Sequence, residues 1–281
     1  MDIKNFLGCP ECNLPLSDNL ECSCCHHVYG FKNGVYDIIS TKLSSSQLEQ
    51  VRVNWVTNEM LENESTLNQL KAEWTKIDVS KNKETIEAEN LHNEYMTKLI
   101  KTFSGRVCDL ATGRGTFLKL LADSDNKDFY IVCTDIAKQQ LMLTRKIRQT
   151  DDERIFYIAT DGRYMSFKDG SFDYITSYAA FGNIPDTDKV AGEIHRILKP
   201  NGKIIIKGNY IEKDSKSFEL AKNRGLERGM IEEYLINDLE TAGFKNIVST
   251  IITKAVWTQN QYNLLPMDGE MYYYGVIQAD K

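Results

Sequence analysis

Five of the seven cysteines in this 281-residue chain lie between positions 9 and 25, where they form two C-x-x-C pairs. Two such pairs can present four thiolates to one tetrahedral zinc ion. The metal then replaces the hydrophobic core that about 40 residues cannot build alone. Because disulfides are unusual in cytosolic chains, metal ligation is the preferred interpretation. The pattern predicts a small zinc ribbon whose ligands are Cys9, Cys12, Cys22 and Cys25.

The fourth ligand of this predicted metal site stays open in the sequence. Cys25 completes a C-x-x-C pair with Cys22, whereas His26 would complete a C-x-x-x-H pattern. Cys24 lies inside the second pair and is expected to point away as a spare thiol. A ribbon that has lost its metal is the competing interpretation.

A glycine-containing loop follows a predicted strand and opens a predicted helix. Its candidate cofactor-binding residues are Asp109, Ala111, Thr112, Gly113 and Gly115. Glycines at such a turn let a ligand approach the backbone closely, although an ordinary turn would look similar. A dinucleotide fingerprint would require glycines at positions 111, 113 and 116, but the chain has Ala111 and Thr116. The spacing therefore suits a ligand without a pyrophosphate.

Two acids strengthen the case for a ligand at this loop. Asp135 ends the next predicted strand, about 20 residues later, where an open α/β sheet holds a carboxylate for ribose hydroxyls. Asp161 ends the third predicted strand, where a carboxylate can accept a hydrogen bond from an adenine amino group. The carboxyl ends of neighbouring parallel strands meet at one edge of the sheet. The loop and both acids, flanked by Ile136 and Gly162, therefore outline one nucleoside pocket.

Residues 106–207 resemble the class I S-adenosylmethionine-dependent methyltransferases, in particular the methyltransferase type 11-like group. The family motif acid-x-Gly-x-Gly-x-Gly is matched by Asp109, Ala111, Gly113 and Gly115, with alanine at the first glycine position. The run from Glu193 to Lys203 resembles the signature E-x-x-R-x-L-K-P-G-G, with Asn201 replacing one glycine. The resemblance implies that the loop backbone holds the methionine part of S-adenosylmethionine. It also implies that Asp135 holds the ribose and that Asp161 approaches the adenine.

A second resemblance concerns the N-terminal module. Val28–Ile39 resembles the ribbon tail of some bacterial methyltransferases, including the zinc-ribbon guanine-N1 methyltransferases of large-subunit rRNA. That resemblance covers the ribbon and the general layout, but it does not extend to the substrate-facing loop. The resemblance therefore does not imply an RNA substrate for this chain.

The elements that must position these residues alternate between strands and helices from position 106 onward. The pattern predicts strands over 106–110, 129–134, 155–160, 172–177 and 203–207, with helices over 116–122, 138–149, 187–198 and 230–242. Strands separated by helices imply crossover connections and a parallel sheet covered on both faces. Residues 244–253 and 271–278 are expected to pair as an antiparallel hairpin. The expected fold is α/β and Rossmann-like, a seven-stranded mostly parallel sheet whose last strand is antiparallel.

The chain is expected to divide into a zinc ribbon at 1–40, a helical linker or lid at 41–104 and a cofactor-binding methyltransferase domain at 105–281. Apolar residues of the middle segment recur at helical spacing. Trp55, Trp74 and Tyr95 could enclose an organic substrate there, or they could simply pack against the sheet. His92 in the same segment is expected to face solvent.

The loop after the fourth predicted strand faces the methyl group in the resembling family. Tyr178, Phe181 and Asn183 are the candidates for lining the acceptor pocket, while no catalytic residue can be named. The loop lacks the N/D-P-P-Y/F motif typical of amine and amide methyltransferases. We expect an enzyme that methylates a small molecule; the alternatives are an rRNA or tRNA base methyltransferase that docks through its ribbon, and a binding module without catalysis.

Composition narrows the setting of the protein. The net charge of −6 gives no whole-protein argument for nucleic-acid binding, although a local basic patch would still permit RNA. No apolar run reaches the roughly 18–20 residues that span a bilayer, and the N-terminus lacks a signal-peptide core. We expect a cytoplasmic location and no membrane partner.

Overall fold

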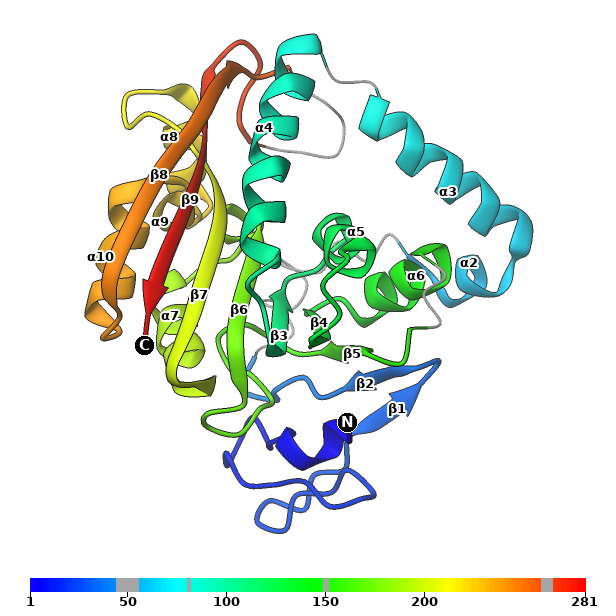
Figure 1. Cartoon of the computed structure of the whole chain (residues 1–281). Helices are drawn as coiled ribbons and strands as arrows, with labels where there is room; N and C mark the ends of the chain where they lie inside the picture. Colours follow the sequence, from blue (N-terminus) through cyan, green and yellow to red (C-terminus); the bar gives the residue numbers. More distant parts are fainter. Residues whose placement is uncertain (44–55, 80–81, 149–151, 259–264) are drawn as a thin grey trace.

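The computed structural model describes residues 1–43, 56–79, 82–148, 152–258 and 265–281. Its centre is one nine-stranded sheet with the order β1-β2-β5-β4-β3-β6-β7-β9-β8 (Figure 1). The strands are β1 (Gly30–Lys32), β2 (Val35–Asp37), β3 (Gly105–Leu110), β4 (Phe129–Asp135), β5 (Ile155–Ala159), β6 (Phe172–Tyr178), β7 (Leu198–Tyr210), β8 (Lys245–Val256) and β9 (Met271–Asp280).

Strands β3 to β7 pair in parallel, whereas β9 lies antiparallel between β7 and β8. The seven strands β3 to β9 are those expected from the sequence, so the predicted Rossmann-like fold and its terminal hairpin are confirmed. The strand order places the ends of β3, β4 and β5 side by side at the carboxyl edge of the sheet. That edge is where open α/β sheets bind ligands.

Helices cover both faces of the sheet, as parallel strands require (Figure 1). On one face lie α4 (Lys83–Ile100), α5 (Thr116–Asp123) and α6 (Lys138–Arg148), which share one core cluster with β3 to β5. On the other face lie α7 (Thr187–Ile197) and α10 (Glu232–Thr241), which share a second core cluster with β6 and β7. The shorter elements are η1 (Ile3–Phe6), η2 (Phe181–Asn183), α8 (Lys216–Asn223) and α9 (Glu227–Met230).

The N-terminal module is continuous with the main sheet. β1 and β2 form an antiparallel hairpin, and β2 then pairs in parallel with β5 through Val35, Tyr36 and Asp37. The backbone N–H of Ile38 extends this pairing by donating to the carbonyl oxygen of Ala159 at 2.9 Å. Residues 1–40 therefore add two strands that the sequence analysis did not expect.

The predicted helical segment is three helices, α2 (Asn58–Glu62), α3 (Glu64–Val79) and α4. Thr57 and Asn82 cap α2 and α4, because each side chain accepts a hydrogen bond from a backbone N–H in the first turn. Ala88, His92 and Met96 recur every four residues and form the buried face of α4. Trp55 lies outside the described residues. Among those that are described, no helix is both long and apolar enough to cross a bilayer.

Candidate functional site

The loop between β3 and α5 has an unusual backbone that its residue types explain. Gly113 and Gly115 have φ angles of 52° and 70°, in the left-handed region where glycine carries no side-chain penalty. A Cβ on Gly115 would also lie 2.7 Å from Cγ2 of Thr144. Ala111 adopts φ 53°, a conformation that costs an alanine roughly 1–2 kcal/mol. The loop is thus held in a defined shape that exposes backbone groups.

Asp135 lies at the end of β4 and fixes this loop. Its Oδ2 accepts a hydrogen bond from the N–H of Gly113 at 2.9 Å, and its Oδ1 accepts one from the N–H of Ala137 at 2.9 Å. Burial raises the pKa of the Asp135 carboxyl, and these backbone N–H groups partly offset the effect. Each carboxylate oxygen can accept a second hydrogen bond, so the side chain retains capacity for a ligand hydroxyl.

Asp161 lies at the corresponding position after β5, and its partner is a residue that the sequence analysis missed. Arg163 donates from Nε to Oδ1 and from Nη2 to Oδ2 of Asp161, both at 2.9 Å. Both side chains are buried, as a bidentate ion pair in a protein interior requires. The only sequence signal for this pair is the short spacing in Thr160-Asp161-Gly162-Arg163.

A cavity of about 230 Å³ opens between the ends of β3, β4 and β5 and the loop after β6. The predicted residues that line it are Ala111, Gly113, Asp135, Ile136, Asp161, Gly162 and Asn183. Thr112 and Gly115 are not among its lining residues. Arg163 and Pro185 contribute further lining that was not predicted. The tertiary structure thus brings most of the proposed nucleoside-binding residues around one space.

Asp109 lies beneath the loop and does not line this cavity. It is 1% exposed, and its Oδ2 has no hydrogen-bond partner in the described part of the chain. Burial, reinforced by the nearby Asp135 carboxylate, raises the pKa of Asp109 to about 7. The backbone oxygen of Asp109 accepts hydrogen bonds from the hydroxyls of Thr112 and Thr134 at 2.9 and 3.1 Å. Asp109 therefore supports the loop from below.

The predicted acceptor-facing residues lie next to the same cavity. Asn183 lines both the main cavity and a narrower one of about 30 Å³, whose lining includes Phe181, Lys207 and Tyr272. Tyr178 stacks on Phe117 with ring centroids 5.5 Å apart. Tyr178 lines neither cavity, whereas Phe181, Tyr272 and Lys207 give the narrower one a mixed aromatic and cationic lining.

Helix α4 contacts Tyr178 at the end of β6 but lines neither of the two cavities. The hydroxyl of Tyr178 donates to Oδ1 of Asn93 on α4, and the Lys207 ammonium lies 3.4 Å from the centre of the Tyr178 ring. Tyr95, also on α4, accepts a hydrogen bond from the side chain of Gln278 at 3.2 Å. The helix thus joins the last strands of the sheet to the end of β6.

The expectation that His92 faces solvent is wrong. His92 is fully buried, and its Nε2 lies 2.9 Å from the carbonyl oxygen of Gly275 on β9, which can only accept. Nδ1 therefore carries no proton, and it has no partner within the described residues. Burial, with a contribution from the Lys207 cation, lowers the pKa of His92 to about 2. The apolar spacing of Leu91, Tyr95 and Leu99 pointed to a neighbouring face of the helix, whereas the buried face carries His92 and Met96 and Leu91 is exposed.

Trp74 on α3 is buried beneath the guanidinium group of Arg148 and does not line the cavity. The guanidinium carbon of Arg148 on α6 lies 5.8 Å from the centre of the Trp74 ring. Trp74 belongs to the core cluster on the α4–α6 face. Its position agrees with the alternative in which the aromatic side chains of this segment pack against the domain.

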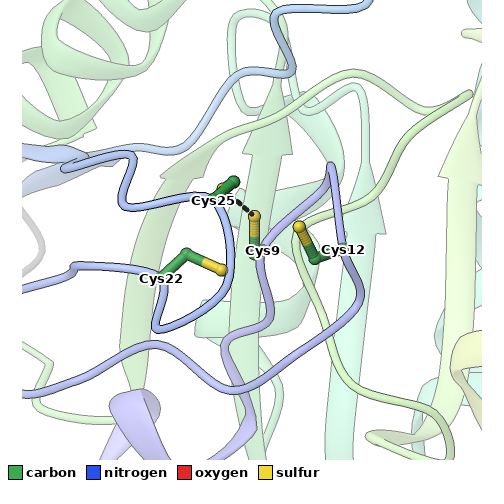
Figure 2. Close-up of side chains that lie close together, drawn as sticks. All are labelled: Cys9, Cys12, Cys22 and Cys25. Atoms are coloured by element: carbon green, nitrogen blue, oxygen red, sulfur yellow. Dashed lines mark hydrogen bonds between the residues drawn. The ribbon is translucent and has the colours of Figure 1, made fainter.

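The four cysteines of the two C-x-x-C pairs converge in space (Figure 2). The Sγ atoms of Cys9, Cys12, Cys22 and Cys25 all lie within 4.8 Å of one another. Four thiolates at a Zn–S distance of about 2.3 Å in a tetrahedron would be roughly 3.8 Å apart. The side chain of His26 is exposed and its Nδ1 lies 3.6 Å from Glu21, outside this group. The donor set and its spacing therefore fit a zinc ion.

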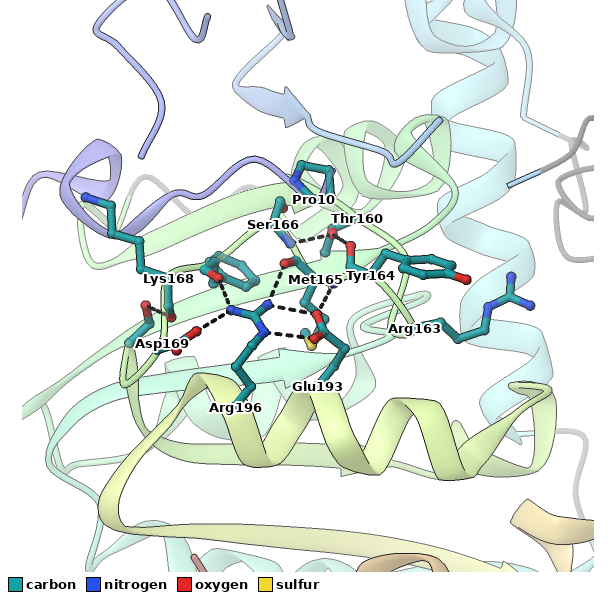
Figure 3. A network of polar contacts seen from close by, with 12 residues as sticks. Pro10, Thr160, Arg163, Tyr164, Met165, Ser166, Lys168, Asp169, Glu193 and Arg196 are labelled. Carbon is teal, nitrogen blue, oxygen red and sulfur yellow. Dashed lines mark hydrogen bonds and ion pairs between the residues drawn. The ribbon is translucent and has the colours of Figure 1, made fainter. Parts of the chain in front are cut away.

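The signature Glu193-x-x-Arg196 has a structural role on α7 (Figure 3). Glu193 accepts a hydrogen bond from the N–H of Met165 at 2.8 Å. Arg196 donates to the carbonyl oxygens of Phe167 and Met165 at 2.6 and 3.0 Å, and to both carboxylate oxygens of Glu193. The pair therefore holds the segment that follows the Asp161 turn.

Residues 108–206 match the family profile described as a methyltransferase domain. This segment is a class I methyltransferase domain. It contains the glycine loop, Asp135, Asp161 and the Glu193–Arg196 pair, so the matched region and the cavity coincide. The matched residues also span β3 through most of β7.

Curated relatives match the same region of the methyltransferase domain. A ubiquinone/menaquinone biosynthesis C-methyltransferase, UbiE, of Wigglesworthia glossinidia brevipalpis is 37% identical over 103 residues, covering 36% of this chain and 41% of that protein. A demethylmenaquinone methyltransferase of Thermus thermophilus is 31% identical over 101 residues, covering 36% and 46%. The chain spans less than half the length of these relatives.

The fold of the methyltransferase domain is also found in solved structures. Phosphoethanolamine N-methyltransferase 2 of Haemonchus contortus, in complex with S-adenosylhomocysteine, superimposes with a TM-score of 0.52. The two chains are 19% identical, and the match covers 67% of this chain and 52% of that one. The likeness concerns the fold alone.

Proposed function

We propose that this chain is an S-adenosylmethionine-dependent methyltransferase that transfers a methyl group to a small-molecule acceptor. The observation that carries the proposal is the single cavity lined by Gly113, Asp135 and Asp161 inside the matched methyltransferase domain. The narrow space beside Asn183 adjoins that cavity and marks the side from which we expect the acceptor to approach. The names of the relatives refer to menaquinone biosynthesis and to phosphoethanolamine, which supports a small-molecule acceptor.

The proposed cofactor site assigns each part of the ligand to a strand end. The backbone of Ala111, Thr112, Gly113 and Gly115 would hold the methionine part, with Asp109 supporting it from below. Asp135, beside Ile136, would accept hydrogen bonds from the ribose hydroxyls. Asp161 and Gly162 would face the adenine. Arg163 already donates a hydrogen bond to each carboxylate oxygen of Asp161. We therefore expect the Asp161 side chain to be fixed in place, with its charge compensated by Arg163. Each oxygen can still accept a further hydrogen bond.

When bound, S-adenosylmethionine supplies a methyl group already activated on a sulfonium, so the protein needs mainly to position the acceptor and exclude water. Tyr178, Phe181 and Asn183 would line the acceptor side. Tyr178 is held by its hydroxyl on Asn93 and by its stacking on Phe117, which limits its rotation. The α4 helix that carries Asn93 would then form one wall of the acceptor site, the role proposed for the segment 41–104.

We also propose that Cys9, Cys12, Cys22 and Cys25 hold one structural zinc ion. Four thiolates with no open position are typical of a structural site rather than a catalytic one. Elemental analysis of protein purified without chelators should find about one zinc per chain. Absence of any bound metal would contradict this assignment.

The function itself is tested by methyl transfer from radiolabelled S-adenosylmethionine. Purified protein is incubated separately with a cell metabolite extract and with total RNA, and label is followed into each fraction. We expect label in small molecules and none in RNA above the background of heat-denatured protein. Label in RNA alone would support the ribbon-docked RNA methyltransferase instead, and no transfer together with no binding of S-adenosylhomocysteine would overturn the proposal.

A further inference from the structure

The segment 160–168 connects the proposed cofactor site to the N-terminal ribbon. Its first part, Thr160 to Arg163, lines the cavity. Its last part runs beside the ribbon, where Leu7 and Phe167 form an antiparallel bridge. Ser166 closes the turn between these parts, because its N–H donates to the Thr160 hydroxyl at 3.1 Å. A displacement at the ribbon would therefore reach the cavity within a few residues.

The ribbon makes backbone hydrogen bonds directly to the end of this segment. The N–H of Gly8 donates to the carbonyl oxygen of Ser166 at 2.9 Å, and the N–H of Lys168 donates to that of Phe6 at 3.0 Å. The packing is close, since a Cβ on Gly8 would lie 3.1 Å from the carbonyl carbon of Phe167. Gly8 directly precedes Cys9, the first of the four clustered cysteines.

The ribbon also holds the start of the segment. β2 pairs with β5, and the N–H of Ile38 donates to the carbonyl oxygen of Ala159, immediately before Thr160. The N–H of Thr160 in turn donates to the carbonyl oxygen of Asp135 at 3.0 Å. Both ends of the segment thus depend on residues 6–38, which enclose all four cysteines.

On its other side, the segment is held by α7 through Glu193 and Arg196 (Figure 3). These contacts come from Glu193 and Arg196, which lie outside the ribbon and its four cysteines. The ribbon shares its hydrophobic core with α7, but it carries the four cysteines, and zinc ribbons of about 40 residues commonly need the metal to fold stably. Of the two supports, only the ribbon is expected to change with metal occupancy.

We propose that the ribbon is a positioning element of the cofactor site, so that metal binding at the four cysteines and cofactor binding at residues 160–163 are thermodynamically coupled. Gly8 and Ile38 are the positioning residues, because they act on Ser166 and Ala159 rather than on the ligand. The inference rests on the proposed function and on the proposed zinc ion. Coupling of this kind is reciprocal: whatever factor the metal contributes to cofactor affinity, the cofactor contributes to metal affinity.

The test measures the affinity of S-adenosylhomocysteine by calorimetry in the zinc-loaded chain, in the chelator-stripped chain and after zinc is restored. We expect binding about fivefold or more weaker without zinc, and recovery on restoration. In the reverse direction, saturating S-adenosylhomocysteine should strengthen zinc retention against a chelator by the same factor. A merely structural ribbon would not produce this matching pair of factors.

Two pairs of variants separate coupling from general unfolding. Cys22→Ser, which removes a clustered sulfur, should lower S-adenosylhomocysteine affinity as stripping does, whereas Cys24→Ser, at an exposed cysteine outside the cluster, should not. Gly8→Ala keeps all four cysteines but pushes against Phe167, so we expect two- to fivefold weaker binding at unchanged zinc content. Gly30→Ala is the matched control, because its Cβ would make only an ordinary 3.7 Å contact.

Hydrogen exchange of the β3 and α5 amides checks that the domain stays folded in each sample. Equal affinity for S-adenosylhomocysteine with and without zinc would overturn the coupling and leave the proposed function intact. Failure of the zinc-loaded chain to bind S-adenosylhomocysteine would instead overturn the proposed function.

Discussion

Asp109 at the cofactor edge of the sheet and His92 on the α4 face are both buried ionisable side chains, but they are enclosed in different ways. At the cofactor edge, Asp109 is enclosed by residues close to it in the chain or on neighbouring parallel strands, such as Thr112 and Thr134. On the α4 face, His92 is enclosed by β9, where its partner Gly275 is 183 positions away. The first environment is built by a short motif, and the second only by the completed fold.

Burial disfavours the charged form of both side chains, so the folded chain keeps Asp109 neutral up to about pH 7 and His92 neutral down to about pH 2. For the acid this raises the pKa, and for the imidazole this lowers it. The two regions should therefore lose stability at opposite ends of the pH range. Replacing either side chain and measuring the free energy of unfolding against pH tests this difference.

The largest effect is expected for Asp109→Asn, which removes the buried acid without changing its shape. In the wild type, the unfolded chain releases this proton above about pH 3.9, while the folded chain keeps it until about pH 7. The free energy of unfolding therefore falls as pH rises through this window, by at most about 4 kcal/mol. Urea unfolding should show the variant gaining stability over the wild type between pH 4 and pH 8.

Asp125→Asn, at an exposed acid, is the control for this comparison and should follow the wild type. If the Asp109→Asn and wild-type curves stay parallel from pH 4 to pH 8, folding does not raise the pKa of Asp109. S-adenosylhomocysteine affinity should change little, since the hydrogen bonds from Thr112 and Thr134 go to the backbone oxygen of residue 109, which the variant keeps.

The opposite pH dependence is expected from His92→Gln, whose amide can still donate to Gly275. The folded wild type resists protonation of His92 down to about pH 2, whereas the unfolded chain protonates it below about pH 6.5. The free energy of unfolding therefore falls as pH falls below about 6.5, by roughly 2–3 kcal/mol at pH 4.5. The variant should lack this loss, as measured by denaturant unfolding at pH 8 and pH 4.5. A loss of equal size in the variant would assign the acid sensitivity to other groups.

Asp135→Ala tests the cofactor edge through binding rather than stability. Loss of charge-assisted hydrogen bonds to the ribose should weaken S-adenosylhomocysteine binding at least about tenfold, corresponding to roughly 1.5–3 kcal/mol. Calorimetry measures the change, with Asp125→Ala as a control of the same charge difference. Unchanged affinity would remove Asp135 from the proposed site.

The smallest effect is expected for Tyr178→Phe on the acceptor side. The variant loses the hydroxyl contact to Asn93, which should raise the KM for the acceptor identified in the transfer assay about two- to tenfold, at roughly 0.5–1.5 kcal/mol. S-adenosylhomocysteine affinity should stay within about twofold of the wild type. Tyr130→Phe, at the far end of β4, is the matched control. An unchanged acceptor KM, or a loss of cofactor affinity alone, would show that Tyr178 does not act on the acceptor.

Much of the fold could be predicted because its signals are local. Alternating strands and helices from position 106 onward predicted the parallel sheet, and two successive strand patterns with no helical pattern between them predicted the terminal hairpin. The division of the segment 46–103 into separate helices was not predicted. Asn63 and Asn82 lie where the described helices begin or end, and asparagine favours such positions without dictating them.

The sequence by itself determined the cysteine spacing, the glycine loop and the acids at successive strand ends. Each of these is encoded within a few residues, because a turn, a metal pair or a strand end depends on its immediate neighbours. Only the tertiary structure decided that β2 extends the sheet beside β5. It also decided that His92 lies buried against β9. These contacts depend on which surfaces meet after the chain has folded, and hydrophobic periodicity reveals that a face is buried without revealing what covers it.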